Sequence, residues 1–127
     1  MARHYLCFIT TMSRIQAQQN AQLIRAALPL LTLTLISQDE SYGYQLVERL
    51  ADHGLQVTTG LVYPLLSRLE RDGLVSSRMV ASTSGPPRKY FSLTASGEAA
   101  KASAEAQWHL VSAVVGQTIA KEHPRND

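Results

Sequence analysis

The 127-residue sequence is poor in the residues that build disulfide frameworks and metal sites. Cys7 is its one cysteine, which excludes an intramolecular disulfide and a cysteine-based zinc cluster, and which fits a reducing compartment. No two of the four histidines have the i, i+4 spacing that places two imidazoles on one helical face. We therefore predict no metal ion and no cofactor.

Long hydrophobic runs are also missing. The richest stretch, residues 28–36, is interrupted by Pro29, Thr32 and Thr34, so about 18 consecutive apolar residues occur nowhere. The sequence thus predicts a protein of the cytoplasm that has no membrane-spanning segment.

The N-terminus carries Arg3 ahead of a short apolar patch at residues 5–9. This patch is shorter than the apolar core of a signal peptide, and no small-residue cleavage site follows it closely. We interpret residues 1–19 as a leader without ordered structure, with Met12 as an alternative start of the chain.

The charges are unevenly distributed along the chain. Residues 39–54 hold four acidic residues and one basic residue, whereas residues 55–91 hold five basic residues and two acidic ones. A basic segment beside an acidic one indicates a surface that meets a polyanion on one side, although a solvated charged face gives the same pattern.

A first helix is predicted over about residues 20–37, where apolar residues recur at steps of three and four. Pro29 falls inside this pattern and lacks a backbone donor, so the helix either kinks or begins there. The apolar face consists of Leu23, Ile24, Ala27, Leu30, Leu31 and Leu35.

Two shorter helices follow, and they are joined by a connection at residues 54–57 whose length is typical of a helix-turn-helix unit. Ser41 can cap the first of them, and Thr58 or Thr59 can cap the second. Glycines at positions 54 and 73 can end them. The face of the second helix that is not apolar carries Thr59, Tyr63, Ser67 and Arg68.

Residues 74–80 and 89–93 are strand-like and flank a turn rich in glycine and proline, which predicts a hairpin. Thr94 can then cap a last helix of about 27 residues, which would reach about 40 Å and exceed the small domain before it. Such a helix must pack against something else. The expected fold is mainly α (α+β), a winged helix-turn-helix with a long C-terminal dimerisation helix.

Three segments occur in the order and spacing of a known family. They are SYGYQL at residues 41–46, GLVYPLLSRLERDGL at residues 60–74, and GPPRKYFSLT at residues 85–94, with Gly97 after them. Together they closely resemble PadR-family transcriptional regulators, and the resemblance covers about residues 22–120. It implies a winged helix-turn-helix, a homodimer, and usually repression that a small effector such as a phenolic acid or a drug relieves. The single C-terminal helix resembles the smaller branch of the family.

Pro64 breaks a local rule in the helix expected to enter the major groove, because a proline inside a helix costs about 3 kcal/mol. Such a departure indicates either a functional site or close packing of Gly60 and Pro64 against the preceding helix. Tyr63 either reaches a phosphate or a base, or packs beneath the wing.

The wing carries Arg88 and Lys89 directly after the Pro-Pro turn, where they can meet phosphates or the minor groove. The hydroxyl groups of residues 82–84 either bind phosphate or belong to a flexible loop tip. The expected partner is double-stranded DNA. The residues expected to bind it are Tyr42, Tyr44, Thr58, Thr59, Tyr63, Pro64, Ser67, Arg68, Ser84, Arg88 and Lys89.

Trp108 occupies a position that resembles a tryptophan lining the dimer-interface pore of multidrug-responsive PadR-like proteins. A flat aromatic effector can stack there, or the side chain simply fills the dimer interface. The residues expected at the ligand site or dimer interface are Trp108, Val111, Val115, Ile119, Leu23 and Leu30.

The domain organisation follows from these elements. We expect a leader at residues 1–19, a DNA-binding domain at 20–93, a dimerisation helix at 94–122 and a disordered tail at 123–127. Motifs of common enzyme classes, such as a P-loop or a dinucleotide-binding glycine pattern, are missing from the sequence, so a non-enzymatic protein is expected. The alternative is a dimeric ligand-binding or interaction module that kept the winged fold and no longer binds DNA.

Overall fold

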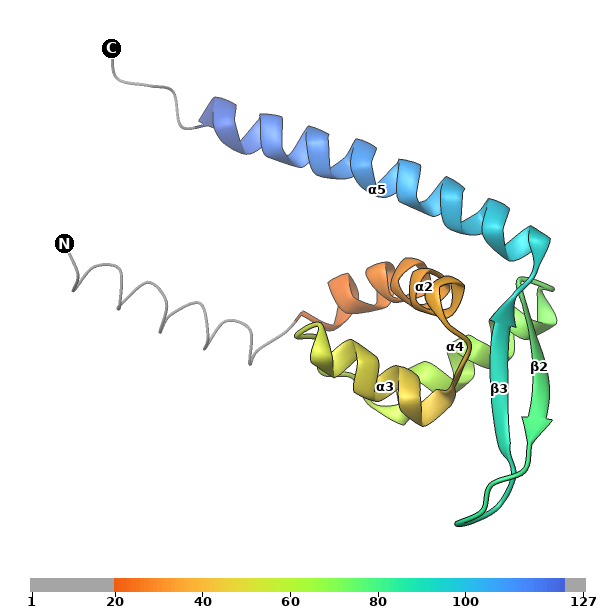
Figure 1. Ribbon diagram of the computed structural model, residues 1–127. Helices are drawn as coiled ribbons and strands as arrows, with labels where there is room; N and C mark the ends of the chain where they lie inside the picture. Colours follow the sequence, from red (N-terminus) through yellow and green to blue (C-terminus); the bar gives the residue numbers. More distant parts are fainter. Residues whose placement is uncertain (1–19, 123–127) are drawn as a thin grey trace, which may run out of the picture.

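The structure, a computed structural model, describes residues 20–122; the expected leader and tail lie outside them. Helices α2, α3 and α4 form a cluster with a small sheet at one end, and α5 returns from the sheet across α2 (Figure 1). The elements are α2 (Ala21–Gln38), β1 (Ser41–Tyr42), α3 (Gly43–Asp52), α4 (Thr59–Arg71), β2 (Val75–Val80), β3 (Arg88–Leu93) and α5 (Ala95–Glu122). This is the expected winged helix-turn-helix with a long C-terminal helix.

Helix α2 begins after Asn20, whose side-chain oxygen accepts hydrogen bonds from the backbone N–H groups of Gln22 and Leu23 at 3.0 and 3.1 Å. The helix continues through Pro29, so this proline does not start it. By length and composition α2 is apolar enough to cross a membrane, with a mean hydropathy of 1.2. Core helices share this property, and five of its residues are buried in the structure: Leu28, Thr32, Leu33, Leu35 and Ile36.

The apolar face predicted for this helix is partly wrong. Leu23 is 70% exposed and Leu30 is half-buried, whereas Leu28 and Leu33 are buried. Because α3, β3 and α5 all contact α2, its buried surface is broader than one stripe and lies toward its C-terminal half.

The sheet has the strand order β1-β3-β2 and is antiparallel throughout. The predicted hairpin is confirmed, with Val75 opposite Leu93 and Val80 opposite Arg88. Strand β1 was not predicted, because Ser41 was expected to cap a helix. Instead Ser41 is fully buried opposite Phe91, and its hydroxyl accepts a hydrogen bond from Arg49 Nη1 at 2.7 Å.

The helix-turn-helix unit has the predicted ends. Gly54 follows α3 with a φ of 92° and Gly73 follows α4 with a φ of 75°, a conformation that glycine adopts without strain. Thr58 occupies the N-cap position of α4, but its side chain makes no capping hydrogen bond.

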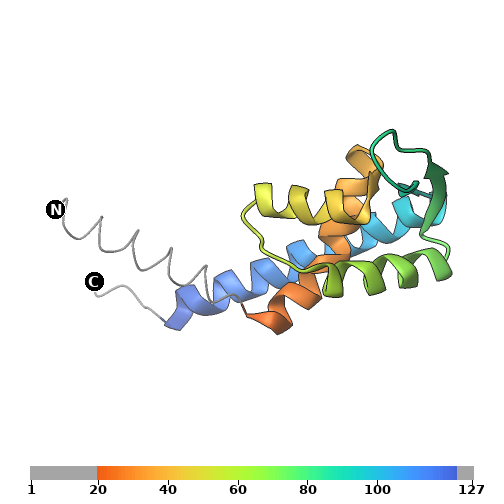
Figure 2. The same cartoon turned by 90° about the horizontal axis from the view of Figure 1, so that it is seen from below.

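The start of α5 is tied to the hairpin. Thr94 caps the helix as predicted, since its hydroxyl oxygen accepts from the Gly97 N–H at 3.0 Å and donates to the Gly73 carbonyl at 2.6 Å. A Cβ at Gly97 would lie 2.0 Å from the Leu74 carbonyl oxygen, so glycine is required for this close approach. From this point α5 runs across α2, and its C-terminal end extends past the other helices (Figure 2).

Candidate nucleic-acid interface

Helix α4 has one buried face and one open face. Val62, Leu65, Leu66 and Leu69 are buried in the core. With 3.6 residues per turn, the opposite face carries Gly60, Pro64, Ser67 and Arg71, and all four are exposed. Tyr63 borders this face on the side of the wing, and Arg68 borders it on the side of α2.

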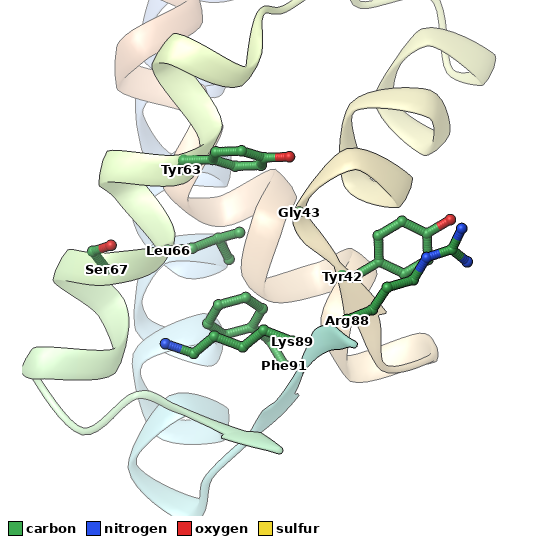
Figure 3. Close-up of a pocket in the computed structure, with 8 residues that line it drawn as sticks. All are labelled: Tyr42, Gly43, Tyr63, Leu66, Ser67, Arg88, Lys89 and Phe91. Atoms are coloured by element: carbon green, nitrogen blue, oxygen red, sulfur yellow. The ribbon is translucent and has the colours of Figure 1, made fainter. Parts of the chain in front are cut away.

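Tyr63 packs against the first turn of α3. A Cβ at Gly43 would lie 2.2 Å from Tyr63 Cε1 and would displace the ring, which Figure 3 shows extending from α4 toward Gly43. Tyr63 remains 47% exposed. Its packing is therefore against α3, and the rest of the ring is open to a partner.

A cavity of about 360 Å³ separates α4 from the wing (Figure 3). It brings together five of the residues expected to bind DNA, from three elements that are distant in sequence. They are Tyr42 of β1, Tyr63 and Ser67 of α4, and Arg88 and Lys89 of β3.

The two wing cations point to opposite faces of the sheet, because successive side chains of a strand alternate. The Arg88 guanidinium lies over the Tyr42 ring at 4.5 Å from its centre, a cation–π contact. Tyr42 in turn meets Tyr90 edge-on, with ring centres 5.3 Å apart. Lys89 is turned instead toward α4 (Figure 3).

Lys89 is held by a carboxylate of α4. Its Nζ lies 2.8 Å from Glu70 Oε1, and the Ser77 hydroxyl donates to the other oxygen of Glu70. These two hydrogen bonds, with Lys89 contributing most, lower the pKa of Glu70. Lys89 is therefore not a free cation in the protein alone, whereas Arg88 has no carboxylate partner among residues 20–122.

A second ion pair joins β2 to the residue that precedes β1, across the central strand β3. Arg78 of β2 hydrogen-bonds the carboxylate of Glu40, with Nε 3.1 Å from Oε2. Their hydrogen bonding lowers the pKa of Glu40 and raises that of Arg78. Arg78 also lies 5.8 Å from the centre of the Tyr90 ring, so its guanidinium contacts both a carboxylate and an aromatic ring.

The sequence over residues 32–103, more than half of the chain, matches the family described as transcriptional regulator PadR-like. The chain belongs to this family. PadR-like proteins are transcriptional regulators and not enzymes. A transcriptional regulator of Mycobacterium tuberculosis is 40% identical over 77 residues, which cover 60% of this chain and 70% of the relative.

Solved structures agree with this assignment. A PadR-family regulator of Eggerthella lenta has a TM-score of 0.72 and 34% identity, and the match covers 92% of this chain and 96% of that one. A PadR-like regulator of Bacillus cereus has a TM-score of 0.70 and 35% identity, covering 78% and 97%. Bacillus subtilis PadR in complex with operator DNA has a TM-score of 0.55 and 22% identity, covering 60% and 45%, which shows the shared fold alone.

The other expected DNA-binding residues of this PadR-like protein lie outside the cavity beside the wing. Tyr44 is 53% exposed on α3, Thr58 and Thr59 begin α4, and Ser84 lies in the hairpin turn, where its N–H is 3.4 Å from Ser82 Oγ. Pro64 and Arg68 face a separate crevice between α4 and α2.

Gly60 is not explained by internal packing. A Cβ at this position would meet only Thr58 Oγ1, at an ordinary 3.5 Å, so the alternative of close packing against α3 is wrong for Gly60. Sequence reasoning also missed Arg71, although it follows Ser67 by four residues and therefore shares the open face of α4.

Trp108 lines a second apolar cavity, of about 530 Å³, between α5, α2 and the end of α3. Leu30 and Leu50 form part of its wall, and Glu105 and His109 lie at the α5 side. Leu23 is not among its lining residues. Further along α5, large apolar side chains are between 49% and 65% exposed: Leu110, Val111, Val114, Val115 and Ile119.

Proposed function

We propose that this PadR-like protein is a cytoplasmic transcriptional repressor that binds a near-palindromic operator as a homodimer. One observation carries the proposal: the open face of α4, with Ser67 and Arg71 on it, lies beside a wing whose Arg88 has no carboxylate partner within residues 20–122. In this proposal residues 20–93 form the DNA-binding unit and residues 94–122 form the dimerisation helix.

The dimensions of α4 suit the major groove. A helix with its side chains is about 10–12 Å across and the groove is about 12 Å wide, so one helix fills it. Thr59, Tyr63 and Ser67 then face base edges, where they determine sequence, and Arg88 faces a phosphate or the minor groove. Phosphate contacts supply affinity for any sequence.

The exposed surface of α5 supports the homodimer. Its large apolar side chains from Leu110 to Ile119 are 49–65% exposed, and an exposed apolar patch of this kind marks an interaction site. A second α5 and the α2 of a second copy would cover it. Two-fold symmetry then places two copies of α4 about 34–36 Å apart along the DNA, or a multiple of that distance.

The cavity beside Trp108 supports release by a small aromatic effector. Its size, about 530 Å³, is within the range of ligand sites, and its walls are mostly apolar. A flat ring stacked on Trp108 would contact α2 as well as α5, and would thereby change how the DNA-binding unit is held against the dimerisation helix. The competing role of Trp108 is packing in the dimer interface alone.

Selection of binding sites from a random-sequence duplex library tests the proposal. We expect the wild-type protein to enrich a near-palindromic sequence, which it then binds at least about 1,000-fold more tightly than a scrambled duplex, as specific regulators do. Enrichment of no sequence would instead favour a winged-helix module that no longer reads DNA.

A further inference from the structure

A crevice lies on the flank of α4 that faces away from the wing. It has a volume of about 240 Å³ and separates α4 from the N-terminal half of α2. Arg25 of α2 and Arg68 of α4 border it, and its other lining residues are apolar or glycine: Leu28, Pro29, Gly60, Leu61, Pro64 and Leu65. We refer to it as the Arg25–Arg68 crevice.

Both arginines are available to a ligand. Arg25 and Arg68 are exposed, and within residues 20–122 neither is paired with a carboxylate. By contrast, two cations of the wing strands, Arg78 and Lys89, are held by Glu40 and Glu70. Two unpaired guanidinium groups at one crevice favour an anion, and the guanidinium geometry suits phosphate oxygens.

The α4 side of the crevice has few side-chain atoms at two positions, Gly60 and Pro64. Gly60 has no side chain, and among residues 20–122 a Cβ at this position would meet only Thr58 Oγ1 at 3.5 Å, so packing within these residues does not require glycine there. Pro64, one turn later, carries a compact ring and no backbone donor. A bulky partner can therefore approach the backbone of α4 closely on this flank.

The geometry of the major groove indicates that this partner is a DNA strand. Two sugar-phosphate strands border the groove, and a helix that fills it has one strand on each flank. The wing, with Arg88, lies on one flank of α4, and the Arg25–Arg68 crevice lies on the other.

We infer that the Arg25–Arg68 crevice holds the second sugar-phosphate strand of the groove that α4 enters. A phosphate lies between the two guanidinium groups, and the adjacent sugar lies against Gly60 and Pro64. Arg25 of α2 is then a DNA-binding residue outside the helix-turn-helix pair and the wing. This inference rests on the proposed function.

Arg25→Ala is the first test, with Arg25→Lys as the control, because lysine keeps the positive charge at the same position. On the selected duplex, Arg25→Ala should lower affinity at every salt concentration. It should also flatten the dependence of log affinity on log salt by about 0.9 for each phosphate that the protein no longer neutralises. Arg25→Lys should keep the salt dependence of wild-type protein. Equal affinity and slope in Arg25→Ala and wild-type protein would overturn the inference.

Gly60→Leu tests the α4 side of the crevice independently, because the added side chain fills the crevice without removing a charge. We expect a loss of affinity for the selected duplex of about 10-fold or more, equivalent to about 1.4 kcal/mol, with an unchanged melting temperature and dimer mass. Gly60→Ala adds only one methyl group, at an ordinary distance from Thr58 Oγ1, and should lose less affinity than Gly60→Leu. Wild-type affinity in Gly60→Leu would overturn the inference.

Hydroxyl-radical footprinting separates this inference from the function on which it rests. Within each half-site, wild-type protein should protect sugars on both strands bordering the groove, and Arg25→Ala should lose protection on the strand at the crevice while the strand at the wing stays protected. Protection of the wing strand alone within each half-site by wild-type protein would overturn the crevice and leave the proposed function intact. No protection of any DNA would overturn both.

Discussion

Lys89 of the wing and Glu70 of α4 form an ion pair, with Nζ 2.8 Å from Oε1. The neighbouring cation, Arg88, lies on the opposite face of the sheet over Tyr42. The two adjacent basic residues therefore differ before DNA binds. Lys89 must break its ion pair with Glu70 to contact a phosphate, whereas Arg88 stacks on the Tyr42 ring and its charge remains exposed.

Glu70→Gln should strengthen DNA binding if Lys89 contacts a phosphate. The substitution removes the carboxylate that holds Lys89 and one negative charge near the DNA. We expect the affinity for both selected and scrambled duplexes to rise, and the salt dependence to steepen by up to about 0.9 per subunit. The double variant Glu70→Gln, Lys89→Ala should lose this gain. An equal gain in the double variant would show that the effect is general electrostatics and not the release of Lys89.

Tyr42 should act as a positioning residue for Arg88. Tyr42→Leu removes the ring under the guanidinium, and cation–π contacts at exposed sites are worth about 0.5–1 kcal/mol, so DNA affinity should fall about 2- to 5-fold. Tyr42→Phe keeps the ring and should bind nearly as well as wild type. In an Arg88→Ala background, Tyr42→Leu should have no further effect; an additive loss would mean that Tyr42 contacts DNA itself.

Alanine substitutions at two glycines of α5 should differ in their effect on the stability of the subunit. Gly97→Ala places a Cβ 2.0 Å from the Leu74 carbonyl oxygen and should destabilise the fold by about 1–3 kcal/mol, measured by denaturant unfolding. Within residues 20–122, a Cβ at Gly116 would meet no atom outside its own stretch of α5 within 4 Å, so Gly116→Ala should not destabilise the subunit. If α5 packs against a second copy, Gly116→Ala should change the dimer dissociation constant in light scattering. A wild-type protein of single-chain mass at micromolar concentration would contradict the dimer.

A planar aromatic compound that binds beside Trp108 should quench the fluorescence of this single tryptophan and weaken operator binding over the same concentration range. Leu30→Trp would fill the same cavity and should reduce binding of the compound, because Leu30 forms part of its wall. If a panel of planar drugs and phenolic acids changes neither emission nor DNA affinity, Trp108 has only a packing role.

Much of this fold was predictable from local patterns. The helix ends at Gly54 and Gly73, the hairpin and the Thr94 cap follow from local sequence rules, because they depend on neighbouring residues. The opposite orientation of Arg88 and Lys89 follows from strand alternation because β3 begins at Arg88, one residue before the predicted strand. The short strand β1 was not predictable, because two residues carry no periodicity and the pairing of Ser41 with Phe91 joins distant parts of the chain.

The rest of the candidate site depends on contacts that sequence spacing does not show. Glu70 meets Lys89, and Arg25 shares a crevice with Arg68, only because the hairpin and α2 pack on opposite flanks of α4. Leu23 looked like a core residue because it fits the helical period, yet it is 70% exposed because the packing elements reach only the later turns of α2.

The central claim is that α4 reads base sequence while Arg88 supplies affinity for any DNA. Titration of wild type, Ser67→Ala and Arg88→Ala on selected and scrambled duplexes at several salt concentrations tests it most directly. We expect Ser67→Ala to reduce discrimination between the duplexes by about 1–3 kcal/mol with an unchanged salt slope. Arg88→Ala should weaken binding to both duplexes and flatten the slope by up to about 0.9 per subunit. Unchanged affinity, discrimination and slope in both variants would contradict the account, because neither α4 nor the wing would then touch DNA.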